Sequence, residues 1–132
     1  MNQVKKKILV VDDNRDIRGL LFKMLDSEGY DVLFAIDGEE ALEIIKSHRF
    51  DLILLDEMMP GKSGIEVLTE IRSSKDSQIK NLAVVMITAK SLIDDIEAAL
   101  SAGATSYIVK PFRAEVIKQK IQNIFKVQPS GA

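Results

Sequence analysis

Five short apolar runs recur along this 132-residue chain, and each is followed by apolar residues at helical spacing. The runs occupy residues 8–11, 32–36, 52–55, 83–87 and 107–109. Strands that alternate with helices in this way form a parallel sheet with helices on both faces. Right-handed crossovers bring the carboxyl ends of all five strands to one edge of that sheet. The alternation therefore predicts a doubly wound α/β fold, in which ligands bind at this edge.

The predicted helices begin at polar caps. Asn14 is placed to cap the first helix, which Gly29 ends. Capping boxes at residues 37–40 and 63–66 open the second and third helices. The polar segment 73–80, which follows the third helix, is expected to be a loop.

Ser91 with Asp94 is expected to cap the fourth helix, and the fifth has its apolar positions over residues 116–125. The length fits one domain, which we assign to residues 1–127. Residues 128–132 have no apolar face, so they are expected to be a flexible tail, the start of a linker or a remnant of expression.

The composition limits the classes of function. The net charge of −2 argues against nucleic-acid binding by this domain, and the absence of cysteine excludes disulfides and thiolate metal sites. The apolar runs are far shorter than the roughly 18 residues that span a bilayer. The run after the basic residues 5–7 is also too short for a signal peptide. We therefore expect a soluble, cytoplasmic domain with no membrane association.

Reactive side chains follow four of the five runs. Asp12 and Asp13 follow the first run, Asp56 the third, Thr88 the fourth and Lys110 the fifth. Taken singly, each is explained as a turn, cap, strand or surface residue. At one sheet edge, however, three carboxylates raise each other's pKa unless a cation lies among them. Oxygen ligands alone favour Mg²⁺, with Mn²⁺ as the alternative, over zinc.

This set of side chains fits phosphoryl transfer. Mg²⁺ held by few protein groups keeps open positions, which phosphate oxygens take. An ionised carboxylate can attack phosphorus and form an aspartyl phosphate, and Asp56, at the end of the central run, is the candidate nucleophile. Lys110 would neutralise charge on the transferred group, and Thr88 would donate a hydrogen bond to it.

Four motifs resemble those of the receiver domain of two-component response regulators. They are V-V-D-D-N, L-L-D-E-M-M-P-G-K-S-G, M-I-T-A and Y-I-V-K-P-F, and the resemblance extends from Lys6 to about Phe125. It implies a flavodoxin-like (βα)5 fold with strand order 2-1-3-4-5. It also implies that Asp56 accepts a phosphoryl group from a phosphohistidine on a sensor histidine kinase or a histidine phosphotransfer protein. Slow autodephosphorylation would follow, rather than the turnover of a conventional enzyme.

The resemblance assigns roles around the acceptor. Asp13 and Asp56 match direct Mg²⁺ ligands, together with the backbone carbonyl of Met58, and Asp12 matches a ligand that acts through water. Lys110 matches the lysine that contacts the phosphate, and its bond to the following proline is usually cis in this family.

The resemblance also implies a switch. Thr88 and Tyr107 match a pair in which the hydroxyl moves toward the phosphate and the aromatic ring turns inward. On packing grounds alone, Tyr107 fits equally well as a half-buried aromatic. Met58 and Lys90 match two positions that vary across this family and tune the phosphoryl lifetime. The face of the fourth helix, fifth strand and fifth helix would bind an output domain, a protein target or a second copy of the chain.

Three competing functions share part of this pattern. A flavodoxin-type flavin carrier has the same fold, but Asp12 and Asp13 would repel a flavin phosphate. A Mg²⁺-dependent aspartyl-phosphate phosphohydrolase typically has a second aspartate two residues after the nucleophile, where this chain has Met58. A pseudo-receiver that serves only as an interaction module is the third, and the complete acidic set argues against it.

Overall fold

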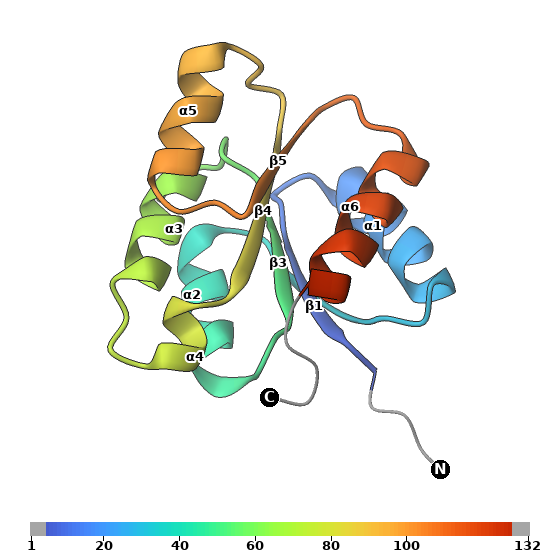
Figure 1. Cartoon of the computed structure of the whole chain (residues 1–132), viewed down its shortest axis with the longest axis horizontal. Coiled ribbons are helices and arrows are strands. Elements are labelled where there is room, and N and C mark those ends of the chain that lie inside the picture. The colour runs from blue at the N-terminus through green and yellow to red at the C-terminus, as the bar shows by residue number, and fades with distance from the viewer. Residues whose placement is uncertain (1–4, 128–132) are drawn as a thin grey trace.

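The computed structural model describes residues 5–127, so the predicted tail at 128–132 lies outside the described residues. Strands and helices alternate through this part of the chain (Figure 1). The elements are β1 (Lys7–Val11), α1 (Arg15–Ser27), β2 (Asp31–Ala35), α2 (Gly38–Ser47), β3 (Leu52–Leu55), α3 (Gly64–Arg72), α4 (Ser77–Lys80), β4 (Ala83–Thr88), α5 (Ile93–Ser101), β5 (Ser106–Val109) and α6 (Ala114–Val127). No helix in the described part is both long and apolar enough to cross a membrane.

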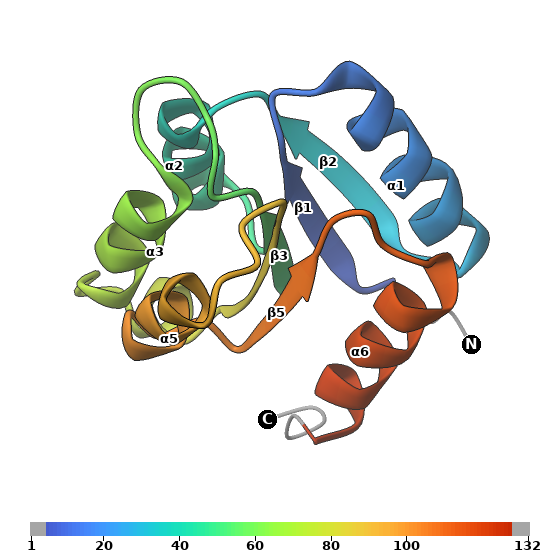
Figure 2. The ribbon, with the colours of Figure 1, turned by 90° about the horizontal axis from the view of Figure 1, so that it is seen from above.

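The five strands form one parallel sheet in the order β2-β1-β3-β4-β5, which confirms the predicted flavodoxin-like fold. Helices α2, α3, α4 and α5 cover one face, while α1 and α6 cover the other (Figure 2). Alternate side chains of a strand enter opposite cores, since Ile53 packs in the first and Leu54 in the second. Strands β3 and β4 are buried along their whole length, as expected of parallel strands covered on both faces.

The strand register brings reactive residues to a common edge. Val11 pairs with Leu55, which in turn pairs with Met86. The strands therefore end nearly level, and the residues that follow them leave the sheet together. The next backbone bonds continue this alignment, because the N–H of Asp56 donates to the carbonyl of Val11 at 3.0 Å.

Most of the predicted caps are present. Asn14 Oδ1 accepts the N–H of Ile17 at 3.0 Å, and Gly29 follows α1 with a positive φ of 87°. The reciprocal capping box of Ser63 and Glu66 is confirmed. The box at residues 37–40 is only half correct, because the Glu40 carboxylate accepts from the N–H of residue 36 instead of the cap residue.

Two local predictions are wrong. The segment 73–80 contains the short helix α4, whose cap Asp76 accepts the N–H of Gln78 at 2.9 Å and whose Ile79 packs on the core. Helix α5 begins one residue later than predicted, so its N-cap is Leu92 and Ser91 does not cap it. Because α4 is an additional helix, the predicted fourth and fifth helices correspond to α5 and α6.

Candidate functional site

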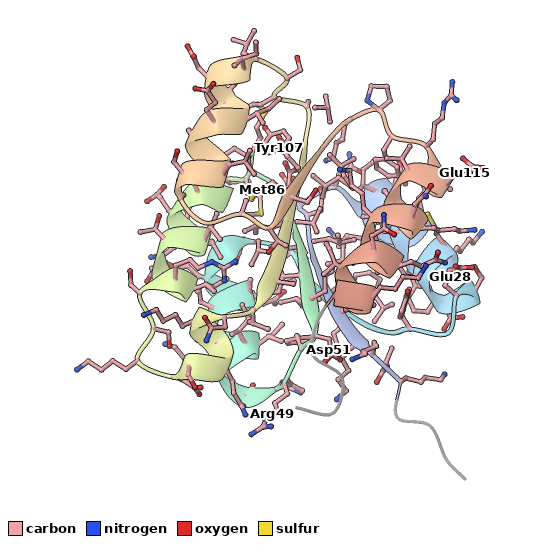
Figure 3. The ribbon with its side chains drawn as sticks, viewed as in Figure 1. Glu28, Arg49, Asp51, Met86, Tyr107 and Glu115 are labelled. Atoms are coloured by element: carbon pink, nitrogen blue, oxygen red, sulfur yellow. The ribbon has the colours of Figure 1, made fainter. Side chains whose placement is uncertain are left out.

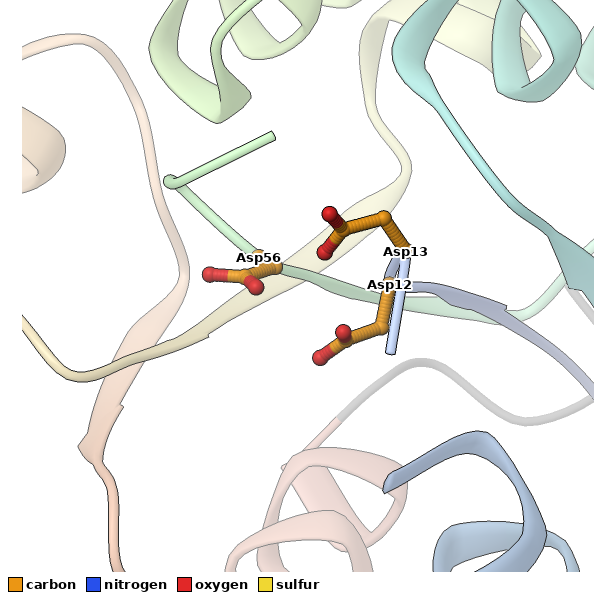
Figure 4. Close-up of side chains that lie close together, drawn as sticks. All are labelled: Asp12, Asp13 and Asp56. Atoms are coloured by element: carbon orange, nitrogen blue, oxygen red, sulfur yellow. The ribbon is translucent and has the colours of Figure 1, made fainter. Parts of the chain in front are cut away.

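Three aspartates lie together at the carboxyl edge of the sheet. Asp12 and Asp13 extend from the end of β1, and Asp56 from the end of neighbouring β3 (Figure 4). One carboxylate oxygen from each lies within 4.8 Å of the others. Asp12 and Asp56 are only 1% and 4% exposed, whereas Asp13 is open to solvent. The predicted convergence of these side chains is therefore present.

Lys110, which follows β5, bridges the two buried carboxylates. Its Nζ lies 2.8 Å from Asp12 Oδ2 and 3.2 Å from Asp56 Oδ2. Burial alone would lower the pKa of Lys110, but the hydrogen bond to Asp12 and the charges of both aspartates outweigh it, so the pKa is raised. With all four groups ionised, the negative charges still exceed the positive charge by two.

Backbone groups orient the other oxygens of the buried pair. Asp56 Oδ1 accepts the N–H of Met58 at 3.1 Å, and Asp12 Oδ1 accepts the N–H of Asn14 at 2.9 Å. Burial raises the pKa of Asp56 above its ordinary value, while the Met58 N–H and the Lys110 charge oppose that rise and the Asp12 charge adds to it. These donors favour the ionised carboxylate that a nucleophile requires.

Thr88 and Tyr107 meet at a third residue, Lys90. The Thr88 side chain is fully buried, and its Oγ1 accepts the Lys90 N–H at a long 3.4 Å. The Tyr107 hydroxyl donates to the Lys90 carbonyl at 2.9 Å. Tyr107 and Met86 lie on the face of the sheet covered by α5 (Figure 3). Burial raises the pKa of Tyr107, so its hydroxyl stays protonated as a donor.

Other predicted residues lie at the rim of the acidic set. Met58 is 55% exposed, and its backbone N–H donates to Asp56 Oδ1. The peptide bond between Lys110 and Pro111 is cis, as the resemblance implied. A cavity of about 530 Å³ lies at the opposite edge of the sheet, beside residues 45–51, and is therefore not part of this set.

Glu57 belongs to this region and was missed by sequence reasoning. Its side chain is buried, and Oε2 accepts the N–H of Ile65 at 2.6 Å at the start of α3. Oε1 lies 3.8 Å from Lys90 Nζ. Burial raises the pKa of Glu57, against the Ile65 hydrogen bond and the Lys90 charge. The one available signal was a second carboxylate directly after Asp56.

Gly64 allows the start of α3 to pack directly against the backbone of Asp56 and Glu57. A Cβ at this position would collide with the Asp56 carbonyl oxygen and would lie 2.7 Å from the Glu57 Cα and 2.8 Å from the Met86 Cε. The N–H of Gly64 donates to the Glu57 carbonyl at 3.0 Å. The first residue of α3 is therefore packed directly against the chain that holds Asp56.

Comparisons with known proteins agree with this geometry. The sequence model of the family described as "Response regulator receiver domain" matches residues 8–122. The chemotaxis protein CheY of Pseudomonas aeruginosa is 40% identical over 121 residues, which are 91% of this chain and 96% of that protein. The response regulator MprA of Mycolicibacterium vanbaalenii is 39% identical over 120 residues, and this chain spans only half of its length.

Solved structures show the same similarity. The chemotaxis response regulator CheY4 of Vibrio cholerae superposes with a TM-score of 0.85 at 34% identity, over 92% of this chain and 99% of that one. A two-component response regulator from Clostridium difficile has a TM-score of 0.88 at 27% identity, over 96% of this chain and 100% of that one.

Proposed function

This chain belongs to the receiver domain family of two-component response regulators, and on that premise we propose that it is switched by transfer of a phosphoryl group to Asp56. The observation that supports this most directly is the contact of Lys110 Nζ with both buried carboxylates. It places an ammonium beside the proposed nucleophile, where the charge of an incoming phosphoryl group would arise.

The acidic set fits a hard divalent cation. It offers only oxygen donors, and its excess negative charge is partly buried, where an unpaired carboxylate is unfavourable. Asp13 and Asp56 would hold Mg²⁺, or Mn²⁺, with the Met58 carbonyl, and Asp12 would act through water. The bound ion would neutralise charge on the phosphoryl oxygens.

The transfer requires no other covalent chemistry. A carboxylate oxygen of Asp56 attacks phosphorus as the bond from phosphorus to the donor histidine nitrogen breaks, and that nitrogen keeps the electron pair and takes up a proton. Lys110 would then contact a phosphoryl oxygen. The same site would release phosphate slowly to water, with the lifetime tuned by Met58 and Lys90.

The switch would run through Thr88 and Tyr107. If the Thr88 hydroxyl moves to donate to the phosphoryl group, the Lys90 N–H loses its acceptor. The Lys90 carbonyl also holds the Tyr107 hydroxyl, so a shift of this peptide would release the ring. Both side chains bond to the backbone of Lys90, which supports the assignment of Thr88 and Tyr107 as a switch pair.

The affected face would be formed by α5, β5 and α6. Leu92 and Ile93 are 70% and 71% exposed at the start of α5, and Val116 is 43% exposed on α6. Large apolar side chains at the surface support docking of an output domain, a target protein or a second copy. We place this exchange, and the encounter with a sensor histidine kinase or phosphotransfer protein, in the cytoplasm.

A small acyl phosphate tests the proposal. With Mg²⁺ present, we expect intact mass spectrometry to show one added phosphoryl group on the wild type, and peptide mapping to place it on Asp56. A chelator should abolish the labelling, and Asp56→Asn should remove it from this site. Absence of label on the wild type, or unchanged labelling of the variant, would contradict the proposal. Continuous release of phosphate from simple esters would favour a phosphohydrolase instead.

A further inference from the structure

Lys90 bonds to both Thr88 and Tyr107 through its backbone, and its side chain lies beside a buried carboxylate. Its N–H and carbonyl bond to Thr88 and Tyr107, which lie in neighbouring strands β4 and β5. Its side chain is 40% exposed, and its ammonium nitrogen lies 3.8 Å from Glu57 Oε1. Among the described residues, the ion pairs of Asp56 involve Lys110 and not Lys90.

The Glu57 carboxylate is held in place independently of the Lys90 ammonium. Its other oxygen accepts the Ile65 N–H at 2.6 Å, and Gly64 packs the start of α3 against the Glu57 backbone. The side chain is 9% exposed and lines a cavity of about 30 Å³ together with Lys90 and Tyr107. The Glu57 carboxylate is therefore held by the backbone of α3, whereas the Lys90 side chain is partly open to solvent.

We propose that Glu57 is a positioning residue that shortens the lifetime of the Asp56 phosphoryl group by holding the Lys90 ammonium away from it. This inference rests on the proposed function. A phosphoryl group on Asp56 would add negative charge one residue before Glu57, so the two anions would compete for the same ammonium. An ammonium on the phosphoryl oxygens would stabilise the acyl phosphate and obstruct the attacking water. Glu57 opposes that state because it retains Lys90.

A double-mutant cycle tests the inference. The four proteins are the wild type, Glu57→Gln, Lys90→Gln and the double variant, each labelled with a small acyl phosphate and followed by intact mass after the donor is removed. We expect Glu57→Gln to lengthen the lifetime about threefold, as fits the loss of one partly exposed ion pair. In the Lys90→Gln background the same change should have no effect, because the ammonium is absent.

The choice of glutamine and one control variant exclude a merely structural effect. Glutamine keeps an oxygen for the Ile65 N–H, and Glu66→Gln is a matched control that weakens the capping box of α3 without touching Lys90. That control should keep the wild-type lifetime. An equal effect of Glu57→Gln in both backgrounds, or an equal effect of Glu66→Gln, would overturn the inference.

The ion pair is also testable without phosphorylation. In amide spectra of the unphosphorylated protein, Lys90→Gln should shift the Ile65 resonance through Glu57, and this shift should disappear in the Glu57→Gln background. No shift would overturn the pairing whatever the labelling result. If the wild type takes no label at all, the proposed function fails, while this spectrum still decides whether Glu57 holds Lys90.

Discussion

At the scale of single residues, the site is a small set of charges whose balance depends on Lys110. Two buried carboxylates share its ammonium, and the third, Asp13, faces solvent. Asp56 is nevertheless unfavourable as an anion in the folded chain, because burial and the Asp12 charge outweigh the two donors that favour ionisation. The residue that accepts the phosphoryl group in our proposal is thus one whose ionisation costs the protein stability.

This cost predicts a pH-dependent gain in stability for Asp56→Asn in the presence of a chelator. The pKa of Asp56 is raised in the folded protein above its ordinary value of 3.8, so the folded chain retains a proton that the unfolded chain has already released. The contribution of this carboxyl to stability is present below the ordinary pKa and is lost as the pH rises through the folded pKa. Urea unfolding should show Asp56→Asn to be more stable than the wild type at neutral pH. The difference should shrink as the pH falls toward about 4.

Asp31→Asn, at an exposed position that begins β2, is the matched control and should show no comparable gain. A variant less stable than the wild type at neutral pH, or a difference independent of pH, would contradict the assignment.

The sequence predicts those side chains of the site that directly follow an apolar run. Asp12, Asp56 and Lys110 are predictable because each directly follows an apolar run. Glu57 is not, because its burial depends on a loop that returns Ile65 to within 2.6 Å of it. No local pattern indicates such a return, and an isolated glutamate after a strand is ordinarily solvated.

At the scale of elements, one guanidinium joins three segments on the face of the sheet covered by α2, α3, α4 and α5. Arg72, the last residue of α3, donates through Nε and Nη2 to the Gly103 carbonyl at 2.9 and 2.8 Å. Its Nη1 donates to the carbonyls of Lys80 and Leu82 at 2.9 and 2.6 Å. Burial lowers the pKa of Arg72. The ends of α4 and α5 are therefore fixed to α3 by backbone acceptors.

Arg72→Met should lower the free energy of unfolding by about 3 kcal/mol, since it leaves three carbonyl oxygens without their charged donor. Arg113→Met, at an exposed position before α6, is the matched control and should change stability by less than about 0.5 kcal/mol. Urea unfolding followed by circular dichroism measures both. Equal stability of the two variants would show that solvent replaces the Arg72 bonds without cost.

The same region explains why α4 was missed. The four residues of this helix form a single turn, which is too short for apolar periodicity to appear. It forms because Asp76 caps it, Ile79 packs on the core and Arg72 binds its last carbonyl. The first of these signals is in the local sequence, but the other two require the rest of the fold. The later start of α5 likewise follows a segment held by bonds to Thr88 and Tyr107.

At the scale of the whole molecule, two apolar cores share one sheet. The layers were predictable because five apolar runs alternating with helices have few compatible topologies, whereas the strand order followed from the resemblance to receiver domains. Each core has its own tyrosine, with Tyr107 packed against the core beside α5 and Tyr30 against the core beside α1 and α6. The chain has no tryptophan and no other tyrosine. The two faces can therefore be observed separately by fluorescence.

Two matched substitutions test whether the faces unfold together. Ile53→Val and Ile8→Val each remove one methylene group from fully buried residues in opposite cores, and each should cost about 1 kcal/mol. Because both cores are built on the same strands, either substitution should shift one common transition. The measurement is urea unfolding followed by tyrosine fluorescence in two backgrounds. Tyr30→Phe leaves only the signal of Tyr107, and Tyr107→Phe leaves only the signal of Tyr30. If a substitution shifts the unfolding transition reported by the tyrosine beside its own core but not the transition reported by the other tyrosine, the two faces unfold as independent units.

The contact between Lys110 and Asp12 joins residues 98 positions apart in the chain. Lys110 follows β5, the last of the five strands along the chain, so the two buried aspartates share its ammonium only in the complete sheet. The proposed acceptor site is thus complete only when β5 has joined the edge of the sheet. If the proposed function holds, a copy in which β5 is missing or misplaced would lack the Lys110 ammonium beside Asp56 and would accept a phosphoryl group poorly.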